Sequence, residues 1–115
     1  MDARLSTPRI ELVSSDTGPQ LQFTVTDSLT GAAVDLTSAT VTMHFRAVGT
    51  TTNLFSRTCA VSAPPADGVA VLSWQSTDLN RDAGDYEGEL ETVLSDGTRQ
   101  TVYDTIQFRL REDFA

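Results

Sequence analysis

The amino-acid sequence predicts an all-β protein, an antiparallel β-sandwich of about seven strands. Apolar and polar side chains alternate with a period of two along most of the chain, and helical periodicity is hard to find. Clusters of Gly, Pro, Asp and Ser separate the alternating stretches, as turns do in sandwiches. The length of 115 residues suits one domain, and a hydrophobic content of 39% is enough to bury a core without disulfide support.

The expected strands, in chain order, are residues 10–13, 20–27, 40–48, 53–62, 69–74, 85–94 and 99–110. They lie within a sandwich domain at residues 9–111, with a polar N-terminal arm at 1–8 and a short tail at 112–115. The stretch 53–62 is the least regular, because Arg57 shares a face with apolar residues, so we expect a sheet edge or a bulge there.

Parity predicts the register of the last hairpin. A two-residue turn at residues 96–97 would pair positions that belong to opposite faces of the two strands. One extra residue sets Tyr86 against Phe108, both on the inner face. We therefore expect a bulge or a longer loop, with Gly97 at positive φ.

The phrase Asp-Ala-Gly-Asp-Tyr before the sixth strand is similar to the tyrosine corner of immunoglobulin-like domains. This similarity implies that the ring of Tyr86 enters the core and that its hydroxyl bonds to backbone a few residues upstream. Gly84 gives the backbone freedom in the turn, and the side chain of Asp82 can accept hydrogen bonds there. Antibody domains carry a disulfide cysteine two residues after the tyrosine, where this chain has Gly88. We expect Trp74 to be the bulky residue near that glycine.

Two longer stretches, "DLTSATVTMHFR" and "DGVAVLSWQSTDLNRDAGDYEGELETVLSDGTRQTV", show a closer resemblance. Their motifs are similar in order and spacing to those of the immunoglobulin-like domain of phage baseplate upper proteins and related tail adaptors. The resemblance covers residues 35–110 and implies a non-enzymatic virion module that docks a fibre, a receptor-binding protein or a decoration onto a larger assembly. The sequence stops at Ala115 without a fibre-forming region, so tail, baseplate, neck and capsid all remain open as locations.

Charge and termini restrict the partners. The formal net charge of −8, from 16 acidic and 8 basic residues, argues against nucleic acid and against an anionic membrane surface. The first 13 residues contain no apolar run of signal-peptide length. We expect a protein made in the host cytoplasm and located in the virion. Its expected partners are other virion proteins, within a homo-oligomer or a symmetric ring.

The sequence offers no catalytic site and no cofactor motif. His44 is the sole histidine and is expected to point outward. The single cysteine, Cys59, cannot form an intrachain disulfide and is expected to be a small buried or half-buried hydrophobe. A calcium site is one alternative: four residues occupy the first, third, fifth and twelfth places of an EF-hand loop, although Ala83 stands where that loop needs glycine. These residues are Asp78, Asn80, Asp82 and Glu89. Turn formation explains them without a metal, and we favour it.

A row of outward acids is the candidate contact surface: Glu87, Glu89 and Glu91. The positions expected to face them on the last strand, which include Tyr103, do not neutralise them. The row could dock a basic partner or could be a solvated face. Three other functions are a capsid decoration protein, an accessory domain of an enzyme complex and a carbohydrate-binding module. The last would need exposed aromatic rings, whereas Trp74 and Tyr86 are expected to be internal and Tyr103 outward.

Overall fold

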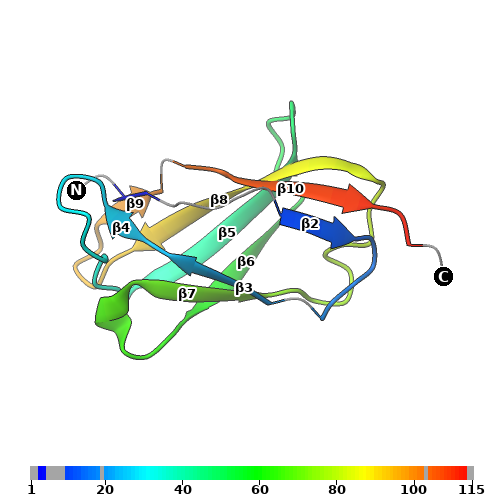
Figure 1. The fold of residues 1–115 in the computed structure, drawn as a ribbon. Helices are drawn as coiled ribbons and strands as arrows, with labels where there is room; N and C mark the ends of the chain where they lie inside the picture. Colours follow the sequence, from blue (N-terminus) through cyan, green and yellow to red (C-terminus); the bar gives the residue numbers. More distant parts are fainter. Residues whose placement is uncertain (1–2, 5–9, 19, 103, 114–115) are drawn as a thin grey trace.

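The structure is a computed structural model that describes residues 3–4, 10–18, 20–102 and 104–113. Its regular secondary structure is almost all strand, with one short 3-10 turn, η1, at Pro65–Asp67 (Figure 1). The ten strands are β1 Ala3–Arg4, β2 Ile10–Val13, β3 Gln20–Thr24, β4 Thr26–Asp27, β5 Thr40–Ala47, β6 Phe55–Val61, β7 Val69–Ser73, β8 Gly84–Val93, β9 Arg99–Thr101 and β10 Ile106–Arg111.

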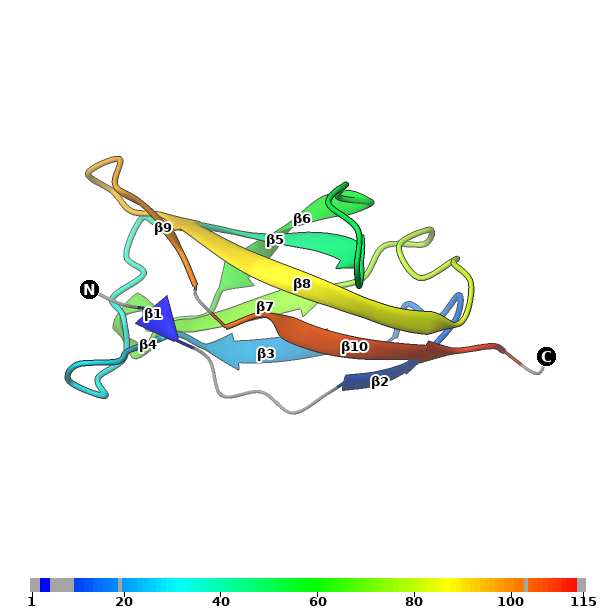
Figure 2. The same ribbon diagram turned by 90° about the horizontal axis from the view of Figure 1, so that it is seen from above.

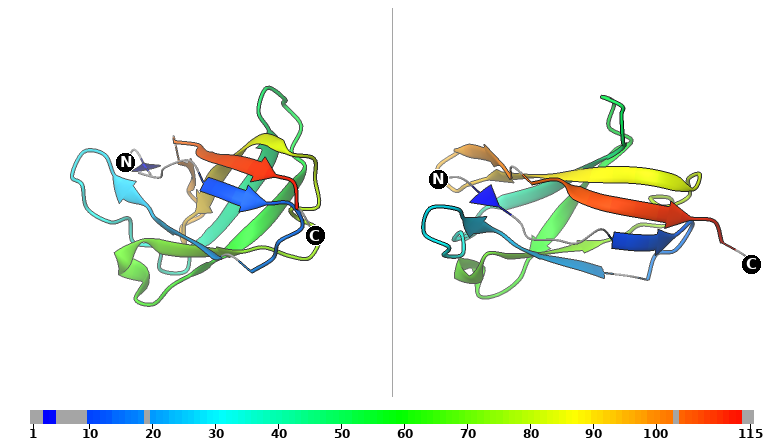
Figure 3. Two further views of the ribbon diagram at one scale, coloured as in Figure 1. Left: turned by 45° about the vertical axis from the view of Figure 1, so that its right-hand side comes forward. Right: turned by 45° about the horizontal axis from the view of Figure 1, so that its top comes forward.

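The strands form two layers, which are seen edge-on in Figure 2 and from two further directions in Figure 3. One layer has the order β2-β10-β8-β5-β6, and the other has the order β6-β7-β3. All of these pairs are antiparallel except β2 with β10. The fold is an immunoglobulin-like β-sandwich, so the predicted fold class is confirmed, and the continuous path contains the seven strands expected.

The irregular pattern of residues 53–62 has a structural cause, because β6 belongs to both layers. Its first part, Phe55–Cys59, pairs with β5, and its last two residues, Ala60 and Val61, pair with β7. A strand that changes sheets presents its side chains to two different surroundings. The strict alternation expected of a half-buried strand is therefore broken here.

The inward positions of the predicted strands form a continuous core. Phe45 lies at its centre. Its ring stacks on Phe55 at 4.8 Å and on Tyr86 at 5.2 Å between centroids, and it meets Phe108 at 5.4 Å. Trp74 packs edge-on against Phe45 at 5.9 Å. The sequence prediction that Trp74 and Tyr86 are internal is confirmed, since they are 5% and 8% exposed.

The register predicted for the last hairpin is confirmed: Tyr86 pairs with Phe108, and Gly97 has a φ of 86°. The extra length is placed differently from a single bulge. The turn closes tightly, with the Leu94 N–H donating to the Thr98 carbonyl at 2.8 Å. The final register is set by a two-residue offset between β9 and β10, because Glu91 pairs with Thr101 whereas Gly88 pairs with Ile106.

The tyrosine corner is formed as expected for its ring and hydroxyl. The hydroxyl of Tyr86 donates to the backbone carbonyl of Asp82 at 2.7 Å. This backbone acceptor is the one expected; the hydrogen bonds expected separately for the Asp82 carboxylate within the turn are not found among the described residues. Gly84 begins β8 with a φ of 158°. The local geometry thus depends on a main-chain acceptor, and the identity of residue 82 matters little to it.

The side chains that pack over Gly88 are not the one expected from the sequence. A Cβ at this position would lie 2.6 Å from Sδ of Met43 and 3.1 Å from a ring carbon of Phe108. These two side chains, and not Trp74, are its nearest neighbours. Trp74 packs edge-on against Phe108, with 5.7 Å between ring centroids. The space that a side chain at residue 88 would occupy is therefore filled by side chains of β5 and β10, the neighbouring strands of the same sheet.

The expected N-terminal arm is partly a strand of the fold. Ala3 and Arg4 pair with Asp27 and Thr26, and Ala3 is buried at 1% exposure. Residues 1–2 and 5–8 of the expected arm lie outside the described residues, as do residues 114–115 of the expected tail.

Replacing Tyr86 with phenylalanine is expected to lower the free energy of unfolding by about 1–2 kcal/mol, because it deletes one partly buried hydrogen bond and leaves its carbonyl acceptor unpaired. Urea unfolding measured by Trp74 fluorescence checks this. Asp82→Ala is the matched control and should change the free energy by less than about 0.5 kcal/mol, because the acceptor is main chain. An equal loss in both variants would contradict the assignment.

Candidate functional site

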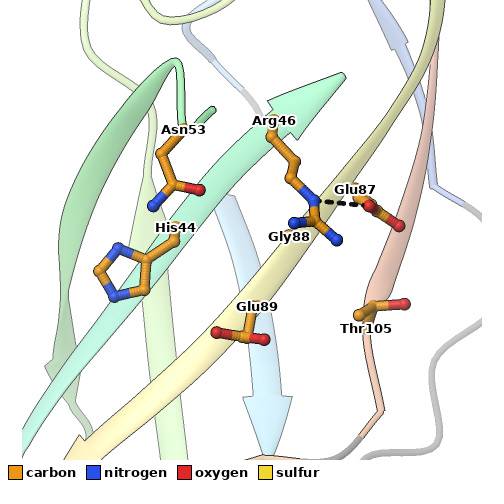
Figure 4. Close-up of a pocket in the computed structure, with 7 residues that line it drawn as sticks. All are labelled: His44, Arg46, Asn53, Glu87, Gly88, Glu89 and Thr105. Carbon is orange, nitrogen blue, oxygen red and sulfur yellow. Dashed lines mark hydrogen bonds and ion pairs between the residues drawn. The ribbon is translucent and has the colours of Figure 1, made fainter. Parts of the chain in front are cut away.

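The outer face of β10, β8 and β5 carries His44 and the acidic row Glu87, Glu89 and Glu91. A shallow hollow lies on this face, between β5, β8 and the loop that follows β5 (Figure 4). Its lining residues are His44, Arg46, Asn53, Glu87, Gly88, Glu89 and Thr105. The hollow has a volume of about 30 Å³, which is room for a water molecule. Small-molecule sites are about tenfold larger than this hollow.

The acidic row is largely neutralised, which the sequence did not predict. Arg46 on β5 lies opposite Glu87, and its Nε is 2.7 Å from the carboxylate, as the dashed line in Figure 4 shows. On β9, Arg99 lies 2.9 Å from Glu91. The acids were expected to face uncharged positions of the last strand, whereas the bases that pair with them come from β5 and β9. Within the described residues, Glu89 is the member of the row without an ion pair.

The alternation of the last strand predicted which of its residues lie opposite the acidic row, and the structure agrees with only part of that prediction. Gln107 does pair with Glu87, but Glu91 pairs with Thr101 of β9. Tyr103, the expected aromatic member of the contact surface, lies outside the described residues.

His44 makes two polar contacts on this face. Its Nδ1 is 2.6 Å from Oγ of Ser56, and its Nε2 is 3.6 Å from a carboxylate oxygen of Glu91. A hydroxyl, an imidazole and a carboxylate in sequence are the components of a hydrolytic triad. A triad also needs free N–H groups that stabilise an oxyanion, and a pocket for the acyl group. The strand backbones here are paired with each other, and the adjacent hollow has room only for a water molecule, so we assign no reaction to this cluster.

The four calcium candidates are not brought together as a site. Asp78 is buried at 2% exposure, and Asn80 and Asp82 are exposed in the loop before β8. Glu89 lies on the outer face of β8. In the part of the chain that the structure describes, no three Asp, Glu, His or Cys side chains are grouped so that they could hold a metal ion.

Asp78 has a different role that sequence reasoning missed. Its carboxylate accepts two hydrogen bonds from the guanidinium of Arg57, one of them at 3.1 Å from Nε, and a third from the N–H of Gln75 at 2.8 Å. Arg57 also lies 5.5 Å above the ring of Phe55. The signal was present in the sequence, because Arg57 stands on the inward face of its strand and a charge there requires a partner.

Cys59 is confirmed as a buried residue, at 4% exposure. Burial raises the pKa of its thiol to about 11, and the hydrogen bond with the Met43 backbone opposes this shift. Thiolate is the reactive form, so little of it exists at pH 8.

We therefore expect Cys59 to resist a water-soluble thiol reagent in the native protein at pH 8 and to react fully once urea unfolds the chain. The change in labelling rate is expected to exceed about 100-fold, since exposed thiols ionise near pH 8.5. Thr58→Cys in a Cys59→Ala background is the matched control, because residue 58 is exposed on the same strand. Rapid native labelling of Cys59 would show that the thiol is accessible.

The described aromatic rings offer no platform for sugar stacking. Each of Phe23, Phe45, Phe55, Trp74, Tyr86 and Phe108 is buried or half-buried. Within the described residues, the exposed large apolar side chains are aliphatic: Leu29, Val48, Leu54 and Val93. The sole helical element described is the 3-10 turn η1, so this part of the chain contains no helix that could cross a bilayer.

Comparison with known proteins identifies neighbours by fold only. No family model matches the chain, and no curated protein matches it. Among solved structures, CopC from Methylosinus trichosporium OB3b is similar with a TM-score of 0.56 and 11% identity, over 98% of this chain and 97% of that one. The fibronectin(III)-like modules of Clostridium thermocellum CbhA have a TM-score of 0.43 and 15% identity, over 96% of both chains. Murine CRIg has a TM-score of 0.43 and 16% identity, over 96% of this chain and 99% of that one.

Proposed function

We propose that this chain is a non-enzymatic structural or adaptor component of a tailed-bacteriophage particle, acting through protein–protein contacts. The observation that carries the proposal is the ordered series of motifs from Asp35 to Gly97 that resembles the immunoglobulin-like domain of phage baseplate proteins. The location within the particle is tail, baseplate, neck or fibre attachment, with capsid decoration as the alternative.

The motifs of that series are structural parts of the sandwich, which is what an adaptor domain requires of them. Asp35 accepts the N–H of Thr37 at 2.9 Å, and Asp96 accepts the N–H of Thr98 at 2.8 Å. The pKa of Asp35 is lowered mainly by the hydroxyl of Thr37, and the pKa of Asp96 mainly by the backbone N–H of Thr98. These turns leave the outer faces of both sheets available for contacts. The hollow on the outer face of β10, β8 and β5 is too small for an organic ligand, which supports contacts with proteins at this face.

Mass spectrometry of particles purified from the producing culture tests the proposal. We expect peptides of this chain in a fixed ratio to the other structural proteins, retained through a density gradient and a high-salt wash. Absence of the chain from mature particles would overturn the proposal. Antibody labelling viewed by electron microscopy separates the two locations, because a tail component labels one end of the particle and a decoration protein labels the whole shell.

A further inference from the structure

The exposed large apolar side chains are divided between the two ends of the sandwich. Within the described residues they are Leu29, Val48, Leu54 and Val93. Leu29 lies in the turn after β4, and Val93 ends β8 opposite Thr40, the first residue of β5. Val48 and Leu54 lie at the other end, in the loop after β5 (Figure 2). Each end of the long axis therefore presents two apolar side chains to solvent.

Leu29 is presented by a closely hydrogen-bonded turn. The N–H of Asp27 donates to the carbonyl of Ala32 at 2.8 Å, and the N–H of Gly31 donates to the carbonyl of Asp27 at 2.7 Å. The carboxylate of Asp27 also accepts the N–H of Leu29 at 2.9 Å. The side chain of Leu29 is 84% exposed. Because the backbone of the turn is already fixed, little conformational entropy is lost when a partner covers this leucine.

A hollow at the opposite end can accept such a side chain. It has a volume of about 360 Å³, and its lining residues are Ala47, Leu54, Asn80, Arg81, Asp82 and Tyr86. The guanidinium of Arg81 is fixed there, since it lies 5.3 Å from the centre of the Phe55 ring and its Nε donates to the carbonyl of Asp78 at 3.0 Å. Small-molecule sites enclose most of their ligand. This hollow is shallow, so it suits a side chain that projects from another protein.

Charge favours contact between opposite ends. The turns at the Leu29 end carry Asp27, Asp35, Asp67 and Asp96. Two such ends repel each other, which disfavours a symmetric contact of this end with itself. The hollow offers the guanidinium of Arg81, which can bind a carboxylate through two hydrogen bonds. A second copy of this chain therefore supplies both the apolar side chain and the acids that the hollow fits.

We propose that copies of this chain assemble end to end, with Leu29 of one copy inserted into the hollow beside Leu54 of the next copy. The aspartates of the Leu29 end then lie near Arg81 of the next copy, and the hydroxyl of Thr30 can donate to the carboxylate of Asp82. This contact joins two different surfaces, so it repeats and builds a ring or a chain of subunits. The proposal does not depend on a virion function.

The size of the ends fits a weak contact. The Cα positions extend over 44 × 28 × 23 Å, so an end has a cross-section of 28 by 23 Å. Stable interfaces cover about 800 Å² on each partner. An end of this size lies at the lower limit of that range. We therefore expect a dissociation constant of about 10–100 μM.

Sedimentation velocity over a concentration series tests the assembly. The intact chain should form species larger than a dimer as its concentration rises. Leu29→Ser and Leu54→Ser should each raise the dissociation constant by about tenfold or more, because each variant removes one half of the apolar contact. Gln107→Ser is the matched control, since residue 107 is exposed on the outer face of β10 and lines neither contact. It should leave the constant within about twofold.

Mixing the two leucine variants guards against a folding artefact. Leu29→Ser keeps an intact hollow, and Leu54→Ser keeps an intact Leu29. At a concentration at which each variant alone is monomeric, an equimolar mixture should form a one-to-one complex. This complex should not grow further, because its two remaining ends are the altered ones.

Four outcomes would overturn the proposal. They are an intact chain that is monomeric at about 300 μM or stops at a dimer, a loss of assembly in only one of the two leucine variants, a mixture of these variants that stays monomeric, and a loss in Gln107→Ser as large as theirs.

Discussion

Replacing Gly68 with alanine is expected to lower the free energy of unfolding by about 3 kcal/mol or more. The residue has a φ of 70°, in the left-handed region that side chains disfavour. A Cβ would lie 2.8 Å from the carbonyl oxygen of Val25 and 2.9 Å from that of Val34. Both contacts are with backbone, so no side-chain rotation relieves them.

The crowding around Gly68 is tied to the pairing of the layer. Val25 donates its N–H to the Gly68 carbonyl at 2.9 Å, and Val34 donates its N–H to the Val25 carbonyl, also at 2.9 Å. Moving these chains apart to admit a methyl group would break hydrogen bonds between buried backbone groups. We therefore expect strain and a lost hydrogen bond to act together.

Gly97→Ala separates these two causes. Gly97 has a φ of 86°, but nothing lies within 4 Å of the position that a Cβ would take. The Gly97→Ala variant should therefore lose only the free energy of holding a side chain at positive φ, about 1–2 kcal/mol. Thermal and urea unfolding of both variants provide the measurement. Equal losses of stability in the two variants would show that the backbone contacts around Gly68 add nothing to the cost of its positive φ.

Replacing Arg57 with methionine is the second large effect, with an expected loss of about 3 kcal/mol. Methionine keeps much of the apolar stem over Phe55 but removes the guanidinium. The side chain of Asp78 is 3% exposed and would then be a buried carboxylate with only the N–H of Gln75 as a hydrogen-bond donor. The side chain of Arg57 is itself 23% exposed, which keeps the expected loss at the lower end of the range for buried pairs.

A double-mutant cycle distinguishes loss of the pair from loss of packing. Asp78→Asn alone removes the charge that Arg57 neutralises, and the double variant should lose less stability than the sum of the single variants by about 1 kcal/mol or more. Arg46→Met is the surface control. Its partner is Glu87, its side chain is 40% exposed, and its loss should stay below about 1 kcal/mol. Additive losses in the cycle would argue that Arg57 and Asp78 act independently.

Local chemistry made much of the fold predictable from sequence. Val41, Met43 and Phe45 alternate with polar residues, and the structure buries all three. The position of Gly97 and the inward ring of Tyr86 followed from rules that operate over a few residues. Even the pairing of Tyr86 with Phe108 followed, because parity leaves few registers in which both strands keep one face inside.

The candidate site was less predictable, because its contacts join residues far apart in the chain. Parity found the row Glu87, Glu89 and Glu91, but not the bases of β5 and β9 that neutralise two of its members. The inward Arg57 was noticed as an irregularity, and its partner Asp78 was interpreted as part of a turn. Pattern rules state which face a side chain occupies, and they do not state which loop lies above that face.

The sequence by itself determined that this chain is a sandwich, which residues fill it, and where the turns and the tyrosine corner fall. Those features depend on alternation and turn chemistry, which are properties of neighbouring residues. Only the tertiary structure decided that β6 crosses between layers, that Asp78 closes over Arg57, and that bases of β5 and β9 neutralise two acids of β8. Each of these depends on the order in which strands assemble, because strand order determines which backbone edges and which charges meet.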